Sequence, residues 1–270
     1  MELDEVTVKN NKRIVVKVGT STLTHSTGNL NLRIMDKLAM VLSDIKNKGY
    51  DVVLVTSGSI TAGVAKLGLK ERPRVVKERQ AAASVGQCEL MFVYDKLFSQ
   101  YGQKVSQILL TKYITDTGST RTNIINTFET LLSYGVIPIV NENDTVAVDE
   151  LVYGDNDTLS AITATLVNAD ILILLTDIDG FYDGNPSEKA DAKLIPVIEE
   201  ITEEIENAAG KAGSIVGTGG MHTKVAAAKI AGGKGIDMVI TNGQKLDLLY
   251  DILEGKQVGT LFKGKKATNS

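Results

Sequence analysis

The sequence predicts an α/β protein in which parallel strands are buried between helices on both faces. Short apolar runs rich in β-branched residues alternate with longer amphipathic stretches. Each run is bounded by glycine or polar residues, which is typical of strands in a parallel sheet covered by helices. The predicted strands are residues 14–18, 52–55, 105–110, 136–140, 171–175 and 238–240.

The amphipathic stretches between these runs predict the helices. Apolar residues at three- and four-residue spacing extend from Ile34 to Ile45, and the pattern stops at Gly49, a residue type that commonly terminates helices. Similar stretches cover residues 77–100, 123–134, 158–168 and 223–231. We expect one domain over residues 1–264, followed by a flexible tail at 265–270.

The composition excludes several classes of partner. Of the 270 residues, 43% are hydrophobic, and 29 Lys and Arg stand against 33 Asp and Glu. The net charge of −4 leaves no positive excess for nucleic acid. No apolar run approaches the ~18 residues needed to span a bilayer, and the acidic N-terminus does not resemble a signal peptide. We expect a cytoplasmic protein without nucleic-acid or membrane partners.

Cysteine and histidine are too scarce for several kinds of site. The single cysteine, Cys88, has no internal disulfide partner, and it lies in a predicted helical stretch, where we expect it to fill the core. With only His25 and His222 available, a multi-histidine zinc site is excluded and Ser-His-Asp catalysis is disfavoured. The chemistry must therefore depend on Lys, Asp, Asn and backbone groups.

Small and polar residues follow four of the predicted strands. Ligands of doubly wound sheets bind beyond the carboxyl ends of the strands, so these residues are candidates for a site. One polar strand end is typical of an ordinary loop, but four together indicate a ligand cleft. The four segments are Gly19-Thr20-Ser21, Thr56-Ser57-Gly58-Ser59, Asn141-Glu142-Asn143-Asp144 and Thr176-Asp177.

Lys17 is a charged residue inside an otherwise apolar strand. An unpaired buried ammonium costs several kcal/mol, so Lys17 is expected to meet an acidic side chain, a bound anion or both. The alternative is an edge strand from which the lysine reaches solvent.

A glycine-rich segment, residues 217–224, leads into an alanine-rich helical stretch. Its glycines allow backbone N–H groups to approach a phosphate at the start of the helix. Lys224 falls in the first helical turn, where the helix dipole disfavours a cation by ~0.3 to 1 kcal/mol, and a bound phosphate would reverse that effect. The segment is not a Walker A motif, and many glycine-rich turns bind nothing.

A second polar segment, residues 153–158, precedes another predicted helix. Asp155 and Asp157 flank Asn156, and this arrangement suits a group that holds lysines or a metal-bound nucleotide. A tight turn with one N-cap residue is the alternative interpretation.

No residue pattern supplies a convincing general base, because there is neither a His–carboxylate pair nor an isolated Glu in apolar surroundings. Phosphoryl transfer to a carboxylate needs none, since an acceptor with a pKa near ~4 has no proton to remove at neutral pH. Lysines and backbone N–H groups would suffice for such a reaction.

Seven segments, in this order, resemble the amino acid kinase family, and within it the branch that phosphorylates free glutamate. They span almost the whole chain. The segments are residues 16–21, 57–63, 79–87, 141–144, 153–157, 175–182 and 217–221.

The resemblance implies a three-layer α/β/α sandwich with a mainly parallel central sheet. MgATP is expected over the C-terminal half of the domain and glutamate over the N-terminal half. By position, Lys17 and Lys224 would contact the transferring phosphoryl group, and Asp157 would organise these two lysines with help from Asp155. These residues are the implied catalytic group.

The resemblance also implies two sets of binding residues. Gly19 and Gly58 would bring backbone N–H groups close to the ligands. The glutamate-binding residues would be Ser57, Gly58, Asp144 and Asn156. The ATP-binding residues would be Lys17, Gly19, Thr176, Asp177, Thr218, Gly219, Gly220, Met221 and Lys224.

The implied activity is transfer of a phosphoryl group from ATP to the γ-carboxylate of L-glutamate, which gives γ-glutamyl phosphate in the first step of proline biosynthesis. Mg²⁺ would enter as MgATP, with no protein ligand assigned to it. The resemblance further implies feedback inhibition by L-proline, and we expect a homo-oligomer, either a dimer or a tetramer.

Two departures from the family pattern limit the resemblance. Many members carry a C-terminal PUA domain, whereas this chain ends soon after Leu261-Phe262, so a form without that domain is expected. Residues 112–121 match less well, which leaves oligomer contacts and regulation less defined.

Three other functions compete with this interpretation. A kinase of the same family could act on N-acetylglutamate, aspartate, carbamate or UMP, although residues 79–87 and 141–144 favour free glutamate. A nucleotide-linked oxidoreductase is disfavoured because the first strand is not followed by a G-x-G-x-x-G turn. A non-catalytic amino-acid sensor is disfavoured because Lys17, Asp157 and Lys224 are all present.

Overall fold

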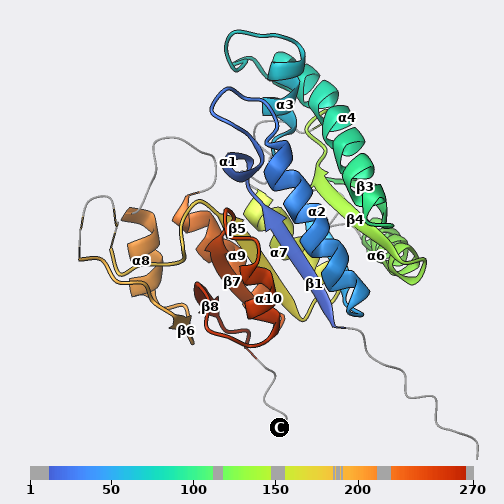
Figure 1. The fold of residues 1–270 in the computed structure, drawn as a ribbon. Coiled ribbons are helices and arrows are strands. Elements are labelled where there is room, and N and C mark those ends of the chain that lie inside the picture. Colours follow the sequence, from blue (N-terminus) through green and yellow to red (C-terminus); the bar gives the residue numbers. More distant parts are fainter. Residues whose placement is uncertain are drawn as a thin grey trace, which may run out of the picture.

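The described residues of the computed structural model form one sheet of eight strands (Figure 1). These residues are 12–111, 118–146, 156–184, 186, 189, 191–211 and 220–265. In space the strands follow the order β3-β4-β2-β1-β5-β7-β8-β6. The strands are β1 (Arg13–Val18), β2 (Asp51–Val55), β3 (Lys104–Leu110), β4 (Val136–Glu142), β5 (Ile171–Thr176), β6 (Val197–Ile198), β7 (Asp237–Asn242) and β8 (Thr260–Phe262).

Helices cover both faces of the sheet and complete three layers (Figure 1). Side chains of α2, α4 and α10 join one hydrophobic core cluster, and those of α6, α7 and α9 join the other. The helices are α1 (Thr20–Leu23), α2 (Leu32–Asn47), α3 (Ser59–Lys66), α4 (Val76–Gln100), α6 (Gly118–Ser133), α7 (Asn156–Leu166), α8 (Glu203–Lys211), α9 (Met221–Gly232) and α10 (Leu248–Leu253).

Strand β1 lies in the middle of the sheet and pairs in parallel with β2 on one side and β5 on the other. Its side chains alternate between the two cores: Val15 contributes to one cluster, and Ile14 and Val16 contribute to the other. The chain extends from β1 outward in both directions, so a topological switch point lies beside this strand. In open α/β sheets such a point is where ligands bind.

The predicted α/β class and mainly parallel sheet are confirmed, and the six predicted strands lie within one or two residues of the observed ones. The antiparallel pairing of β7 with β8 is an addition. Six further elements are not among those predicted, and four of them have six residues or fewer, too few to display a hydrophobic period. These elements are α1, α3, α8, α10, β6 and β8.

Helices α3 and α4 approach each other at two glycines. A Cβ atom on Gly63 would lie 1.8 Å from the backbone oxygen of Ala82, and one on Gly86 would lie 1.7 Å from that of Ser59. No larger residue fits at either position, so the two glycines fix α4 against the chain that leaves β2.

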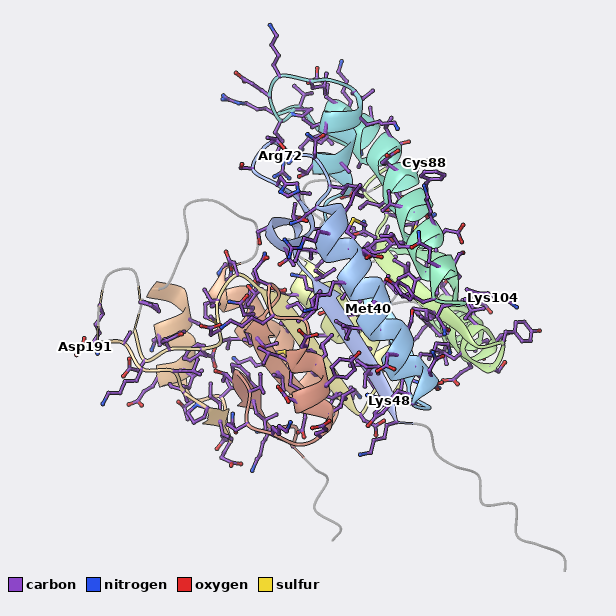
Figure 2. All side chains as sticks on the ribbon, in the orientation of Figure 1. Met40, Lys48, Arg72, Cys88, Lys104 and Asp191 are labelled. Atoms are coloured by element: carbon purple, nitrogen blue, oxygen red, sulfur yellow. The ribbon has the colours of Figure 1, made fainter. Side chains whose placement is uncertain are left out.

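The prediction that Cys88 lies in the core is wrong, because its side chain is exposed on α4 (Figure 2). The buried face of α4 includes Gly86, Leu90 and Tyr94, with Gln87 beside them. Cys88 is one position beyond that stripe, and the 100° step of a helix turns it outward.

The structure also bears on the predicted absence of a membrane span and on the predicted C-terminal tail. Within the described ranges, no helix combines the length and apolar character needed to cross a bilayer. The backbone N–H of Lys265, the first residue of the predicted tail, donates to the Gly232 carbonyl at 3.0 Å. Residues 266–270 lie outside the described residues.

Candidate active site

Two lysines from distant parts of the chain converge on one carboxylate. Lys17 Nζ lies 2.6 Å from Asp157 Oδ1, and Lys224 Nζ lies 3.1 Å from Asp157 Oδ2. All three residues are buried. Since β1 is paired on both sides, the alternative that Lys17 reaches solvent from an edge strand is wrong, and the predicted acidic partner is Asp157.

The fold explains how the three side chains meet. Lys17 is the penultimate residue of β1, Asp157 is in the first turn of α7, and Lys224 is in the first turn of α9. Helices α7 and α9 pack side by side on one face of the sheet. Their N-terminal turns therefore present Asp157 and Lys224 to the end of β1.

Thr223 is a further member of this cluster. Its Oγ1 lies 2.9 Å from Asp157 Oδ2 and 2.7 Å from the carbonyl oxygen of Gly220, the N-cap residue of α9. The hydroxyl thus ties the carboxylate to the entry of the helix that carries Lys224. Nothing in the sequence relates Thr223 to Asp157, so the sequence pattern places Thr223 only in the glycine-rich segment at 217–224.

The electrostatics of the cluster keep Asp157 ionised. Burial alone would raise the pKa of this carboxyl, but the charges of Lys17 and Lys224, with hydrogen bonds from Lys17 and Thr223, lower its pKa to about 2. At neutral pH the carboxylate therefore holds two ammonium groups close together. Such paired positive charge suits an anionic ligand that carries several oxygens.

The backbone around Lys17 leaves room above its ammonium group. A Cβ atom on Gly19 would lie 3.7 Å from Lys17 Nζ, so a side chain there would occupy the space beside the ammonium. On the neighbouring strand, Thr176 Oγ1 donates to Asp177 Oδ1 at 3.0 Å. Gly220 and Met221 form the entry of α9.

A second polar cluster lies beside the first, and Asn156 connects them because it precedes Asp157. The Asn156 amide nitrogen donates to the Thr56 carbonyl oxygen, to Ser57 Oγ at 3.1 Å and to Asn141 Oδ1 at 2.9 Å. The first turn of α7 thus contributes to both clusters. Asn156 binds residues at the ends of β2 and β4, and Asp157 binds the two lysines.

Asp144 completes this second cluster at the end of β4. Its Oδ2 accepts a hydrogen bond of 2.6 Å from Ser59 Oγ, at the start of α3. Burial raises the pKa of Asp144, while the Ser59 hydrogen bond and the charges of Arg72 and Arg79 partly oppose the increase. Gly58, the N-cap of α3, has a φ of +94°, which glycine adopts without strain.

The structure brings many of the sequence-predicted site residues to the same edge of the sheet. Lys17, Asp157 and Lys224 form one cluster, and Ser57 contacts Asn156 in the other, with Asp144 joined to Ser59. Asp155, Thr218 and Gly219 lie outside the described residues. Gln87 and Asn141 join the second cluster without having been predicted as individual site residues, although both belong to segments that carry the family resemblance.

Among the described ranges, no group of three or more His, Cys, Asp or Glu is arranged to hold a metal ion. The ammonium groups of Lys17 and Lys224 instead fit the phosphate oxygens of a nucleotide.

Comparison with known proteins defines the class. The model of the amino acid kinase family matches residues 12–242, so the chain belongs to the amino acid kinase family. Among its relatives, the glutamate 5-kinase of Clostridium perfringens (strain 13 / Type A) is 54% identical over 263 residues, covering 96% of this chain and 98% of the relative. The glutamate 5-kinase of Listeria innocua serovar 6a is 56% identical, with 96% and 95% covered.

Solved structures of other kinases share the fold. Carbamate kinase from Giardia lamblia, bound to AMP-PNP, has a TM-score of 0.68 at 19% identity and covers 95% of this chain and 99% of its own. The product complex of isopentenyl phosphate kinase from T. acidophilum has a TM-score of 0.65 at 18% identity, with 93% and 100% covered. The three-layer architecture is therefore confirmed.

Proposed function

We propose that this protein transfers the γ-phosphoryl group of ATP to the γ-carboxylate of L-glutamate, the first step of proline biosynthesis. The observation that carries the proposal is the convergence of Lys17 and Lys224 on Asp157, next to the amide and carboxylate groups at the ends of β2 and β4. The high identity to relatives named glutamate 5-kinase supports the choice of acceptor.

The chemistry needs few protein groups. A γ-carboxylate oxygen attacks the γ-phosphorus in line, the bond from phosphorus to the β,γ-bridging oxygen breaks, and ADP leaves with that electron pair. No proton has to be removed, because the acceptor is already ionised. Lys17 and Lys224 would neutralise charge on the transferring group, and Asp157 would keep the two ammonium groups in position.

We further propose one domain over residues 1–264, with glutamate bound over its N-terminal half and nucleotide over its C-terminal half. Ser57, Gly58, Asp144 and Asn156 would bind the amino acid. Lys17, Gly19, Thr176, Asp177, Gly220, Met221 and Lys224 would bind ATP, together with Thr218 and Gly219, and Asp155 would assist Asp157. Mg²⁺ would enter on the nucleotide phosphates and offset their charge.

Acceptor choice tests the proposal directly. With MgATP, purified protein is expected to release ADP much faster with L-glutamate than with aspartate, N-acetylglutamate, carbamate or UMP. The carboxylate of Asp144 favours a cationic α-amino group, which N-acetylation removes, and aspartate is one methylene too short to reach the phosphoryl group. Coupled detection of ADP at equal acceptor concentrations measures the preference. Faster ADP release with any of the other acceptors would contradict it.

Free L-proline is expected to inhibit by competing with glutamate. Proline shares the α-carboxylate and a cationic nitrogen but lacks a γ-carboxylate, so it can occupy the recognition groups without being phosphorylated. Its ring also limits the conformational entropy lost on binding. Initial rates at several glutamate concentrations, with and without millimolar proline, measure the effect. Inhibition relieved by more glutamate supports the prediction, whereas unchanged rates at subsaturating glutamate would disprove it.

Two further proposals concern the state of the enzyme in the cell. Exposed apolar side chains of Leu67, Leu69 and Val75 around the α3–α4 connection, and of Phe92 on α4, support a homo-oligomer. A cytoplasmic location follows from the need for ATP as the phosphoryl donor.

A further inference from the structure

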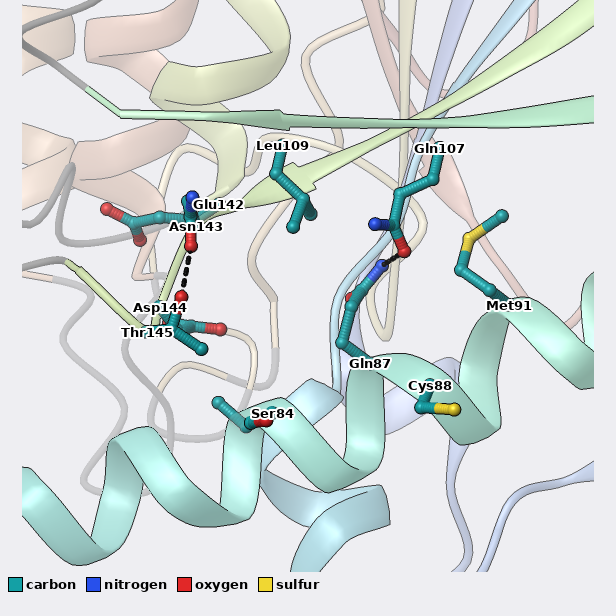
Figure 3. A pocket seen from close by; sticks show the side chains of 11 residues that line it. Ser84, Gln87, Cys88, Met91, Gln107, Leu109, Glu142, Asn143, Asp144 and Thr145 are labelled. Atoms are coloured by element: carbon teal, nitrogen blue, oxygen red, sulfur yellow. Dashed lines mark hydrogen bonds between the residues drawn. The ribbon is translucent and has the colours of Figure 1, made fainter.

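Four side-chain amides form a continuous hydrogen-bonded chain from the edge of the sheet to the candidate site. Gln87 Nε2 donates to Gln107 Oε1 at 3.1 Å, and Asn141 Nδ2 donates to Gln87 Oε1 at 2.8 Å. Asn156 Nδ2 then donates to Asn141 Oδ1 at 2.9 Å. Figure 3 shows the outer link, between Gln87 on α4 and Gln107 on β3.

Backbone groups determine which atom donates and which accepts in each of these amide hydrogen bonds. The N–H of Glu142 donates to Asn141 Oδ1 at 2.9 Å, and the carbonyl oxygen of Thr56 accepts from Asn156 Nδ2. A backbone N–H can only donate and a carbonyl can only accept, so both asparagine amides have one allowed orientation. Asn141 must therefore donate from Nδ2 to Gln87, and Gln87 accepts this hydrogen bond with Oε1.

The fixed orientation determines what Asn156 can offer a ligand. Its Nδ2 is used by acceptors from Thr56, Ser57 and Asn141, and no contact between described residues uses its Oδ1. Asn156 can therefore accept a hydrogen bond from a ligand but has no donor left to give one. The ligand group that fits is a hydrogen-bond donor such as an ammonium.

Gln87 is the link that joins helix α4 to this chain. It is buried, with 9% of its surface exposed, and it follows Gly86, whose close contact with the Ser59 backbone fixes the position of α4. Its amide is the bridge between the amides of β3 and β4.

We propose that Gln87 is a positioning residue for acceptor recognition: the backbone decides which way the two asparagine amides face, and Gln87, through its hydrogen bond with Asn141, holds the Asn141 side chain against Asn156, so that Asn156 Oδ1 stays directed to the α-ammonium group of the amino-acid substrate. The inference rests on the proposed function, because it assumes a free amino acid as the acceptor. In this proposal Gln87 acts through its hydrogen bond to Asn141 and not by binding the substrate.

Gln107 provides a matched control at the outer end of the chain. It is exposed on the edge strand, and with Gln87 and Met91 it lines a pocket of about 380 Å³ that extends to Asp144 (Figure 3). Water can replace its carbonyl as an acceptor for Gln87, so losing the Gln107 amide should leave the inner links intact.

The test compares Gln87→Met, Gln107→Met and wild type, with glutamate and with glutarate, which lacks the α-amino group. Methionine has nearly the same length and flexibility as glutamine but no amide. For Gln87→Met we expect KM for glutamate to rise about 10-fold, the effect of losing roughly one well-placed hydrogen bond. Its kcat and its KM for ATP should stay within about 3-fold of wild type, and Gln107→Met should behave as wild type.

Glutarate distinguishes a specific loss of ammonium recognition from a general loss of activity in the Gln87 variants. Because it has no ammonium group, its kcat/KM should be nearly unchanged in Gln87→Met, so the preference for glutamate over glutarate falls about 10-fold. Gln87→Glu should recover most of the preference, since a carboxylate oxygen still accepts from Asn141. Equal loss with both acceptors, or an unchanged preference, would overturn the proposal.

A failure of the proposed function and a failure of the Gln87 proposal give different results. If wild-type protein releases no ADP with glutamate, the proposed function fails before the Gln87 variants are considered. If Gln87→Met does not fold, Gln87→Ala carries the same prediction, with melting temperature measured for every variant. A folded Gln87→Ala that keeps the full preference for glutamate would refute the positioning role.

Discussion

Replacing Lys17 with alanine is expected to lower kcat by at least ~100-fold, as is typical when an electrostatic stabiliser of a charged transition state is removed. The protein should remain folded, because Asp157 keeps its contacts with Lys224 and Thr223. Steady-state ADP release with saturating glutamate and MgATP measures the loss, and circular dichroism checks the fold.

The same loss is expected for Lys224→Ala, since Lys224 contacts the other oxygen of the same carboxylate. Lys37→Ala is the matched control, because Lys37 forms an ion pair with Asp247 on the surface and not with the cluster. That variant should keep wild-type turnover. Near-normal turnover in Lys17→Ala or Lys224→Ala would show that the lysine in question does not act on the transferring group.

Lys17 illustrates how far the sequence alone can predict the site. A lysine in an apolar strand requires a partner, and this argument holds without any knowledge of the fold. The identity of the partner depends on how α7 docks on the sheet, 140 residues further along the chain. The apolar pattern of α7 predicts a buried helix, and the polar segment before it suits a group that holds lysines. The family resemblance then assigns Asp157 to Lys17 and Lys224.

Gln87 illustrates what the sequence pattern misses. Its position on α4 belongs to the buried stripe, so periodicity alone would interpret it as part of the core. Its function depends on amides of β3 and β4 that come 20 and 54 residues later, and on the backbone N–H of Glu142. No local sequence pattern shows which amide donates and which accepts when the hydrogen bonds join different helices and strands.

On the same helix, Cys88 is a residue that the sequence pattern places in the core but that the structure exposes to solvent. The helical pattern around Cys88 predicts a core position for this lone cysteine. However, the glycines at positions 63 and 86 determine which face of α4 packs against α3 and the sheet. That rotation is a tertiary property, and a one-residue offset is enough to expose the side chain.

Replacing Asp157 with alanine is expected to reduce both activity and stability. Without the carboxylate, two buried ammonium groups face each other, and breaking a buried ion pair by removing one partner typically costs about 3–5 kcal/mol. Turnover should fall at least ~100-fold, because the repelling lysines would no longer hold the phosphates in place. Urea unfolding at pH 7 measures the stability loss, and Asp247→Ala, in an exposed ion pair, should lose less than about 1 kcal/mol.

The pH dependence identifies the cause of that instability. The folded-state pKa of Asp157 is about 2, below the ordinary 3.8, so its ionised form stabilises the fold above about pH 4. This contribution, about 2 kcal/mol, is lost as the pH falls through the folded-state pKa, because protonation then removes the charge that the lysines need. The stability difference between wild type and Asp157→Ala should therefore narrow as the pH is lowered from about 4 to about 2. A difference that stays constant over this range would mean that lost packing, not the lost charge, destabilises the variant.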